Sequence, residues 1–343
     1  MTINFLKNIF ILLLISISSN AQTVHRVTNG MNLQTVIDNA ASGDVILVEA
    51  GVYGNINITK KLLLSGPGYY LNNGNSAYVG TSTLGTINFL MGSELSIIQG
   101  FISGDINVGA GSVTVQRNKV GNIRIGHNGN VAVRADNVLV KHIIGGRPEV
   151  HAQSVSFIIK NNIFYGGFYF DTPGLGEVAN NTFDCDISNH EAYFGHNFLN
   201  VQFRSNIFGG IWNHTNGNFG YNEGYPNQFI DTYTPFIIEK NIFNKNYPQL
   251  APSNLVNVSF TDMYLAYPTN PNNLQEDARY QLAPNSPARG AGENGTDCGA
   301  FGGDDPYVLS GIPDIPSIYY LNVQPSVPQG GTLNVQIKAK TNN

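Results

Sequence analysis

The 343-residue sequence contains few of the residues on which many enzyme and scaffold classes depend. Its two cysteines, Cys185 and Cys298, exclude a disulfide-dense scaffold and a cysteine-rich metal site, and whether they pair with each other stays open. Charged residues make up 12% of the chain, which is about half of the usual share, and the net charge is −5. A negative balance of this kind argues against nucleic acid as the main partner.

Several catalytic signatures are also absent. The chain has no Gly-x-Ser-x-Gly elbow, no His-Glu-x-x-His zinc motif and no phosphate-binding Gly-Lys loop. Hydrolysis of a pectin-like sugar chain needs two carboxylates close together, one as the acid and one to hold water. The adjacent aspartates Asp304 and Asp305 lie near the end of the chain, away from its central repeats. The sequence therefore does not predict a hydrolase of this kind.

Long hydrophobic runs are scarce. One apolar run, Ile9 to Ile17, lies near the start of the chain, between Lys7 and a segment of small residues that ends at Ala21. This order is typical of an export signal over residues 1–21 that is cleaved near Ala21. The run is roughly half of the ~20 apolar residues that a membrane-spanning helix needs. We therefore expect a protein without a membrane span, either secreted or held at the cell surface.

The residues in excess are 45 asparagines and 38 glycines. From about residue 62 to 300, short β-branched and apolar segments alternate with Gly and Asn, which predicts a succession of buried strands. Residues 32–41, NLQTVIDNAA, place Leu33, Val36 and Ile37 at helical spacing and predict one amphipathic helix near the start of the mature chain.

A short motif recurs within the strand-rich part, as in KNNIFYGG at 160–167 and RSNIFGGI at 204–211. Its anchor residues are separated by 19 to 35 residues. A motif that recurs while the length of chain between its copies varies predicts a coil of parallel strands. Each rung of such a coil has one obligatory turn, and its loops can differ in length. Aligning the motifs gives the reference positions Asn118, His142, Asn162, Asn181, Asn206 and Asn241.

Stacked coils explain why this motif needs asparagine. A sharp bend between strands needs the left-handed backbone conformation that asparagine tolerates. Because rungs stack about 4.8 Å apart, equivalent asparagine side chains can also satisfy one another in a ladder. The aromatic residue two positions later is expected to point inward and stack in the same way, at Phe164, Phe183, Phe208 and Phe243.

Three stretches resemble the right-handed parallel β-helix proteins secreted by bacteria, in a poorly characterised branch of the pectate-lyase-like superfamily. They are LQTVIDNAASGDVILVEAGVY, the NNIF tetrads and residues 280–307, YQLAPNSPARGAGENGTDCGAFGGDDPY. The resemblance covers about residues 30–311 and implies an all-β fold: a single-stranded right-handed parallel β-helix over residues 22–311 with an N-terminal capping helix. Such proteins include pectate and alginate lyases, polygalacturonases and surface proteins without an assigned activity, so the resemblance implies an architecture rather than a reaction.

Residues 312–343 differ from the repeats. Leu333, Val335 and Ile337 alternate with polar residues, which predicts a half-buried strand. About thirty residues are too few for a separate sandwich domain, which takes about 100. We expect a short β-appendage packed on the end of the coil, with a hinge near Pro313.

Five cations lie one or two residues before the reference positions: Arg117, Lys141, Lys160, Arg204 and Lys240. Like charges on successive rungs repel one another unless anions or acidic side chains nearby offset them. The column therefore suggests an acidic polysaccharide as ligand. The alternative is a set of solvated side chains that splay apart into water.

A second column follows about nine residues after the reference positions: His127, His151, Asp171, His190 and His214. A histidine beside an aspartate suits a general base, and it equally suits a transition-metal site. Accidental alignment of surface histidines is the alternative. Asp184 and Asp186 flank Cys185 on an expected strand, so that both carboxylates share a face and suit a Ca²⁺ ion.

These features lead to two hypotheses. In the first, the outer face of the coil binds an extracellular acidic polysaccharide and cleaves it by β-elimination, in which a base removes the proton beside a carboxylate and a cation stabilises the enolate. The candidates are Lys141, Arg147, His151 as base and Asp171 as its orienting partner, with Arg117, Lys160, Arg204 and the aromatic Trp212 as ligand contacts. In the second, the protein is a non-catalytic surface or matrix protein and the coil is a rigid spacer.

Overall fold

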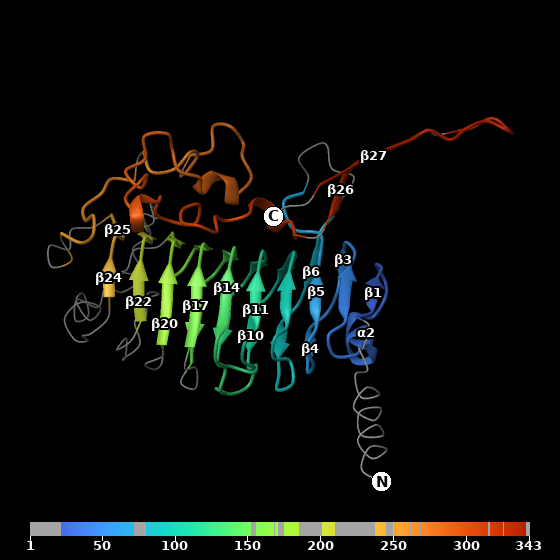
Figure 1. Ribbon diagram of the computed structural model, residues 1–343, viewed down its shortest axis with the longest axis horizontal. Helices are drawn as coiled ribbons and strands as arrows, with labels where there is room; N and C mark the ends of the chain where they lie inside the picture. Colours follow the sequence, from blue (N-terminus) through green and yellow to red (C-terminus); the bar gives the residue numbers. More distant parts are fainter. Residues whose placement is uncertain are drawn as a thin grey trace, which may run out of the picture.

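The chain forms a parallel β-solenoid, in which successive short strands wind around one long core (Figure 1). The computed structural model describes residues 22–71, 80–151, 156–167, 169–170, 175–184, 201–209, 237–244, 250, 252–260, 262–267, 269–314, 316–324 and 326–340. Three parallel sheets, here called A, B and C, form the walls of the coil. The predicted coil of parallel strands is confirmed; its handedness stays a prediction.

Sheet A runs along the whole length of the coil. Within the described residues it consists, in spatial order, of β1 (Val24–Val27), β2 (Val45–Val48), β5 (Leu63–Ser65), β8 (Ile97–Gln99), β11 (Thr114–Gln116), β14 (Val138–Lys141), β17 (Ser156–Lys160), β20 (Leu175–Ala179), β22 (Val201–Arg204) and β24 (Ile237–Glu239). Every neighbouring pair in this sheet is parallel, since each strand returns one full turn after the last.

Sheets B and C supply the other two walls. Sheet B contains β3 (Gly51–Val52), β6 (Ser82–Leu84), β9 (Phe101–Ser103), β12 (Lys119–Val120), β15 (Ile144–Gly145), β18 (Ile163–Phe164), β21 (Thr182–Phe183), β23 (Ile207–Phe208) and β25 (Ile242–Phe243). Sheet C contains β4 (Ile56–Ile58), β7 (Ile87–Phe89), β10 (Ile106–Val108), β13 (Ile123–Ile125), β16 (Pro148–Val150) and β19 (Tyr169–Phe170).

The inward side chains of the three sheets form one continuous hydrophobic cluster. In β14, for example, Val138 and Val140 are buried while the alternate residues Leu139 and Lys141 remain partly exposed. This alternation is the period of two that a strand imposes on its side chains. One row per wall therefore faces the core, and the other row faces outward.

One helix, α2 (Leu33–Asn39), lies near β1 at the start of the coil (Figure 1). The side chain of Asn32 accepts a hydrogen bond from the Thr35 backbone N–H at 3.0 Å, which satisfies one of the free donors of the first turn. Leu33 and Ile37 are buried in the main cluster. The helix predicted within residues 32–41 is therefore confirmed.

The predicted asparagine ladder is also confirmed. Each side-chain amide donates to the next carboxamide oxygen along the coil, from Asn162 to Asn181 at 2.8 Å, from Asn181 to Asn206 at 3.0 Å and from Asn206 to Asn241 at 2.9 Å. The ladder continues to Asn254, which the repeat pattern did not include. Each oxygen also accepts a backbone N–H of the neighbouring rung, so these fully buried amides are all satisfied.

Beside this ladder the phenylalanines stack as expected. The ring centroids of Phe164 and Phe183 lie 5.5 Å apart, and those of Phe183 and Phe208 lie 5.0 Å apart, as do those of Phe208 and Phe243. All four rings are buried. Aromatic stacking and amide pairing therefore repeat with the same period and hold the rungs in one register.

Two details of the repeat prediction are wrong. The left-handed residue is the one before the repeated asparagine, with φ of 53° at Asn161 and Asn180 and 56° at Ser205, because the asparagine itself is engaged in the ladder. His142 has the same conformation, with φ of 54°, and so aligns with Asn161 rather than with the ladder. The ladder position in that rung is Ile143, whose N–H bonds the Asn162 side chain at 2.9 Å.

The end of the chain runs back along the coil and covers the outer face of sheet B (Figure 1). We call residues 276–314 the closing segment; it includes the 3₁₀ turns η2 (Asp277–Tyr280), η3 (Glu293–Gly295) and η4 (Leu309–Gly311). Its backbone bonds Ser205 at one end and Tyr69 at the other. A second hydrophobic cluster fills the interface, with Ile163 and Ile207 of sheet B against Ala300 of the closing segment.

Beyond the closing segment lies an antiparallel hairpin of β26 (Ser317–Val323) and β27 (Val335–Lys340). It leaves the coil beside β8, where Gln99 donates to the Asp314 carboxylate at 3.0 Å, and extends away from the coil (Figure 1). The strand predicted from the alternation around Val335 and Ile337 is therefore present. The hairpin leaves the coil at its side rather than at its end, because the closing segment runs back along the coil before the hairpin begins.

Two predictions concern residues beyond this description. The export signal at residues 1–21 lies outside the described residues, as does Cys185, so the pairing of Cys185 with Cys298 stays open. Cys298 is buried against the second cluster. Within the described part of the chain, no helix is long and apolar enough to cross a membrane.

The ladder should be essential for stability. Replacing Asn181 with leucine, which has a similar size, leaves the Asn162 amide and the Ile159 carbonyl without their buried partners. We expect a loss of about 2–4 kcal/mol in the free energy of unfolding, since each unsatisfied buried group costs about 1–3 kcal/mol. Urea denaturation followed by circular dichroism measures this change. The exposed loop residue Asn130 is the control, because Asn130→Leu leaves the ladder intact; equal losses for both variants would contradict the role of the ladder.

Candidate functional site

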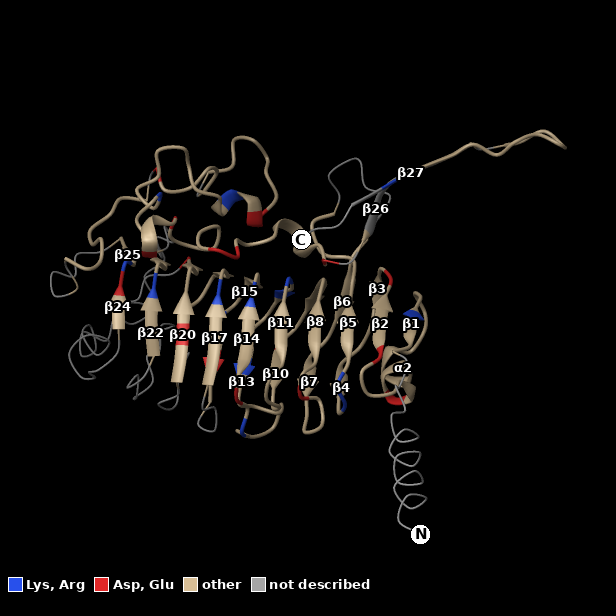
Figure 2. Ribbon diagram, in the orientation of Figure 1, with Lys and Arg blue, Asp and Glu red and all other residues tan. Residues whose placement is uncertain are grey.

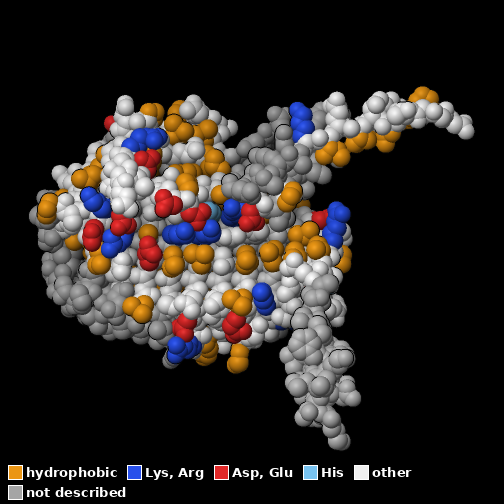
Figure 3. Space-filling model, viewed as in Figure 1, with side chains coloured by type: hydrophobic (Ala, Val, Ile, Leu, Met, Phe, Trp, Pro, Cys, Tyr) orange, Lys and Arg blue, Asp and Glu red, His pale blue; other side chains and the backbone are white. Residues whose placement is uncertain are grey.

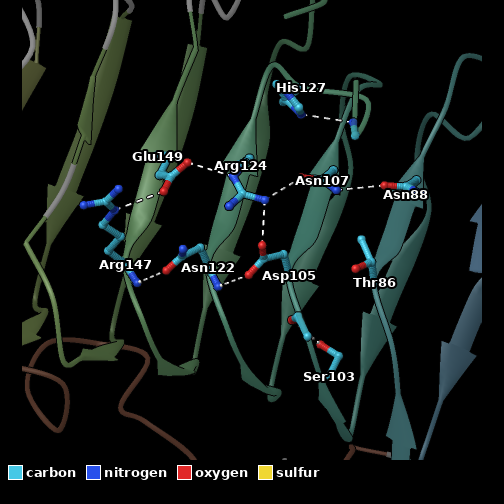
Figure 4. A network of polar contacts seen from close by, with 12 residues as sticks. Thr86, Asn88, Ser103, Asp105, Asn107, Asn122, Arg124, His127, Arg147 and Glu149 are labelled. Carbon is cyan, nitrogen blue, oxygen red and sulfur yellow. Dashed lines mark hydrogen bonds and ion pairs between the residues drawn. The ribbon is translucent and has the colours of Figure 1, made fainter. Parts of the chain in front are cut away.

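The outer face of sheet C carries a row of polar side chains (Figure 4). The middle residue of each of five successive strands lies in this row, and the parallel register aligns them. Because neighbouring strands are about 4.8 Å apart, the row offers hydrogen-bonding groups at regular steps along the coil. We call it the polar row: Asn57, Asn88, Asn107, Arg124 and Glu149.

The amides in the polar row bond one another as those inside the coil do. Asn88 donates to the Asn57 carboxamide oxygen at 2.8 Å, and Asn107 donates to that of Asn88 at 2.8 Å. At the next rung the asparagine is replaced by Arg124, which donates to Asn107 at 3.4 Å. The row thus changes from neutral amides to charged groups within one register.

Arg124 is the centre of the charged part. Its Nη1 donates to the Asp105 carboxylate at 2.7 Å, and its Nε donates to Glu149 at 2.9 Å (Figure 4). Arg147 reaches the other Glu149 oxygen at 3.0 Å. Two guanidinium groups and two carboxylates therefore hold one another in place on an outer wall of the coil.

The turn beside the row is built by the same residues. Asp105 accepts the Asn122 backbone N–H at 2.8 Å, and the Asn122 side chain accepts the Arg147 N–H at 3.1 Å. These bonds fix the backbone at the corner between sheets B and C. Asp105 thus both supports the turn and orients Arg124.

The charges of this group persist over a wide pH range. Burial favours the neutral acid at Glu149, but hydrogen bonds from His151 and Arg147 and the charge of Arg124 outweigh it and lower the pKa of Glu149 to about 2. Burial also opposes charge on Arg124, whereas bonding to Asp105 and the charge of Glu149 raise the pKa of Arg124 overall. At neutral pH the site therefore contains fixed positive and negative charges side by side.

Two histidines lie at the edge of this group. The rings of His127 and His151 are 4.9 Å apart, so the second predicted column is aligned at these two positions. His151 Nε2 lies 3.5 Å from the Glu149 carboxylate. Burial, followed by the nearby His151 and Arg124, lowers the pKa of His127, which keeps this imidazole neutral at neutral pH. A neutral imidazole can accept a proton, and a guanidinium can hold a carboxylate.

The structure brings together some of the residues predicted to act on a ligand and separates others. Arg147 and His151 meet at Glu149 on sheet C. Lys141 instead ends β14 on sheet A, where it bonds Asp305 of the closing segment at 2.8 Å. Four predicted residues lie outside the described residues: Asp171, His190, Trp212 and His214.

Four of the five predicted cations lie within 4.0 Å of an acidic side chain of the closing segment. In the strand register Lys141, Lys160 and Arg204 share one row at the end of sheet A, whereas Arg117 and Lys240 occupy the left-handed position one residue later. Asp305 bonds Lys160 at 3.0 Å as well as Lys141, Glu293 bonds Arg204 at 2.8 Å, and Asp314 lies 4.0 Å from Arg117. Figure 2 shows these cations at the strand ends facing the acidic closing segment.

This pairing explains how like charges can stack on successive rungs. Burial alone favours the neutral acid at Asp305, but the bond from Lys141, the charge of His142 and the bond from Lys160 outweigh it and lower the pKa of Asp305 to about 2. A single carboxylate therefore offsets the repulsion between two neighbouring lysines. The cations at this corner already have ion-pair partners from within the chain.

The predicted Ca²⁺ ligand Asp184 follows β21 and is buried beneath residues that pack on sheet B. Tyr280 donates its hydroxyl to the carboxylate at 2.7 Å. Burial raises the pKa of Asp184 to about 6, although bonds from Tyr280 and Tyr267 offset part of this rise. Asp186 lies outside the described residues, and among the described ones no group of three or more His, Cys, Asp or Glu side chains is placed to hold a metal. The Ca²⁺ site stays a prediction.

Sequence reasoning missed Arg124, Asp105 and Glu149. A signal was present, because GNIRIG and RPEV each place a charged residue between two apolar or turn residues, as an outward strand position does. The alignment started from the asparagine motif, however, and that motif marks the corner between sheets A and B. Arg124 and Glu149 each lie six residues after the ladder position of their rung, Asn118 and Ile143, but the alignment took His142 for that position and followed only residues one or two before and about nine after it.

The sequence matches no model of a known protein family, and no curated protein matches it. What the protein does must therefore be argued from the site.

The buried carboxyl of Asp184 generates a prediction about pH. Its pKa is raised from 3.8 to about 6 in the folded protein, so between these values the folded state keeps a proton that the unfolded state loses. Stability from this group therefore falls as the pH rises from about 4 to 6, by about 3 kcal/mol at most. We expect Asp184→Asn to unfold at higher urea concentration than the wild type at pH 7 and to match it near pH 4.

The control for this experiment is the exposed Asp262. Asp262→Asn should change urea unfolding little and should not alter its pH dependence. If Asp184→Asn is less stable than the wild type at pH 7, the carboxylate is needed in its charged form and the argument from burial fails.

Proposed function

We propose that the protein is secreted and that the outer face of sheet C binds an extracellular acidic polysaccharide. The export signal expected at residues 1–21 supports secretion, and the parallel solenoid supports the resemblance to right-handed β-helix proteins of the pectate-lyase-like superfamily, with α2 as the N-terminal cap and the hairpin as the appendage. The polar row carries the proposal.

The polar row suits a sugar chain that lies along the coil. Amides at Asn57, Asn88 and Asn107 can donate to and accept from hydroxyl groups, and they repeat at about 4.8 Å. Arg124 and Arg147 add planar guanidiniums, which bind carboxylates in a bidentate manner. Because both guanidiniums are already oriented by Glu149, they lose little side-chain freedom when a ligand binds.

Cleavage by β-elimination extends this proposal. We retain His151 as the base that removes the proton beside a uronate carboxylate, and assign Arg147 and Arg124 to that carboxylate, since Lys141 lies on another wall. The guanidiniums would stabilise the negative charge that develops on the enolate. Its electron pair then forms the new carbon–carbon double bond as the bond to the leaving sugar oxygen breaks, and that oxygen takes up a proton from water. Asp171 stays a proposed orienting partner of His151.

One observation favours the alternative, a non-catalytic surface protein. Four cations of the predicted column are paired with Asp305, Glu293 and Asp314 of the same chain: Lys141, Lys160, Arg204 and Arg117. A row that is neutralised internally keeps the coil straight and its closing segment in place. A rigid spacer requires a straight coil of this kind. The two functions therefore differ in whether the polar row binds a ligand.

Binding to pectate, alginate and glycosaminoglycans tests the proposal. By isothermal titration calorimetry we expect at least one of these polymers to bind, and Arg124→Ala to weaken it by about tenfold or more, because the carboxylates of Asp105 and Glu149 would then repel an acidic ligand. Absorbance from a new carbon–carbon double bond reports elimination, which His151→Ala should abolish while binding persists.

Arg26 provides the matched control. It is an exposed arginine at the start of the coil that pairs with Glu49, as Arg124 pairs with Glu149, but it lies outside the polar row. Arg26→Ala should bind as the wild type does. The proposal fails if no acidic polymer binds, or if both arginine variants lose affinity equally, since the effect would then depend on net charge alone.

A further inference from the structure

The hairpin of β26 and β27 exposes an apolar face. Val323 pairs with Val335, and the exposed fractions are 44% for both, 52% for Leu333 and 58% for Ile337. Gln336 alternates with Val335 and Ile337 along β27 and therefore lies on the other face. A two-stranded hairpin on its own is at most marginally stable in water, so this apolar face indicates a partner.

A second unpaired apolar surface lies on sheet A. Outward residues of successive strands form a line in the parallel register, interrupted once by Thr114. Figure 3 shows hydrophobic side chains in a band across this wall, below a band of charged ones. We call it the apolar stripe: Val45, Leu63, Ile97, Leu139 and Ile158.

At its Ile158 end the apolar stripe borders a groove of about 350 Å³. The groove is lined by residues that include Leu139, Ile158, Leu175 and Glu177. Ile158 and Leu175 are 40% and 60% exposed. The groove can take up an apolar side chain, and the charged residue that lines it is acidic.

The two surfaces match in apolar character and in length. From Val45 to Ile158 the apolar stripe crosses six strands, or about 24 Å, and the strands of the hairpin are about 20 Å long. Sheet-on-sheet packing needs one apolar face on each partner, as here.

We propose that the hairpin of one copy packs its apolar face across the apolar stripe of a second copy. The hairpin does not cover its own stripe, because Asp314 is fixed to Gln99 and the two residues before Ser317 include Pro316, whose φ is fixed. Figure 1 shows the hairpin extending away from its own coil. Since the two surfaces differ, the contact is head to tail and does not close on itself, so copies add in a row.

Sedimentation velocity over a range of protein concentrations tests this assembly. The wild type should form species that grow with concentration, while Ile337→Asp in the hairpin and Ile158→Asp in the stripe should each remain monomeric. Gln336→Asp, on the polar face of the hairpin, is the matched control and should associate as the wild type does. A wild type that stays monomeric throughout, or an Ile158→Asp variant that still associates, overturns the proposal.

Mixing the two variants distinguishes a head-to-tail contact from a symmetric one. The Ile158→Asp variant keeps an intact hairpin and the Ile337→Asp variant keeps an intact stripe, so an equal mixture should form a dimer and nothing larger. If hairpins paired with each other instead, the Ile158→Asp variant would dimerise alone. Either that result or the absence of a dimer in the mixture contradicts the proposal.

A crosslinking measurement does not depend on disrupting either surface. A variant with both Ile337→Cys and Ile158→Cys should form a ladder of disulfide-linked oligomers under mild oxidation, beyond any seen for the wild type. An intramolecular disulfide in its place would show that the hairpin closes on its own coil, which contradicts the assembly.

Discussion

The stacking of one rung on the next is the constraint on which the rest of this structure depends. A parallel coil pairs the backbone of each strand with the strands one turn before and after it, and the buried amides from Asn162 to Asn254 fix the register between those turns. Once the register is fixed, residues 13 to 35 positions apart in the sequence become neighbours. The polar row, the apolar stripe and the row of cations all arise in this way.

The closing segment decides which walls remain open. By packing on Ile163 and Ile207 it covers the outer face of sheet B around these residues, and its acids pair with cations at the edge of sheet A, among them Lys141 and Arg204. Two surfaces of opposite character are left, a polar one on sheet C and an apolar one on sheet A. This division of the walls is the physical reason to assign a soluble ligand to one and a protein contact to the other.

Much of the fold could be predicted, because its signals are local. The spacing of Leu33 and Ile37 indicated the helix, and the Asn-x-Phe motif indicated both the ladder and the stacked rings. The error at His142 has a physical cause: the buried slot accepts Ile143 in place of asparagine, so the polar neighbour was aligned in its stead. The candidate site was less accessible, since Arg147 and His151 were found but Arg124, Asp105 and Glu149 were not.

By itself the sequence determined that this chain coils, because the rungs that begin at Asn162, Asn181, Asn206 and Asn241 each carry a sharp turn, a ladder amide and an inward phenylalanine. Only the tertiary structure decided which charges meet. Lys141 was placed in a catalytic group with His151, yet the chain returns Asp305 to it from 164 residues away. No local pattern specifies that contact, since it depends on the path of the closing segment over the finished coil.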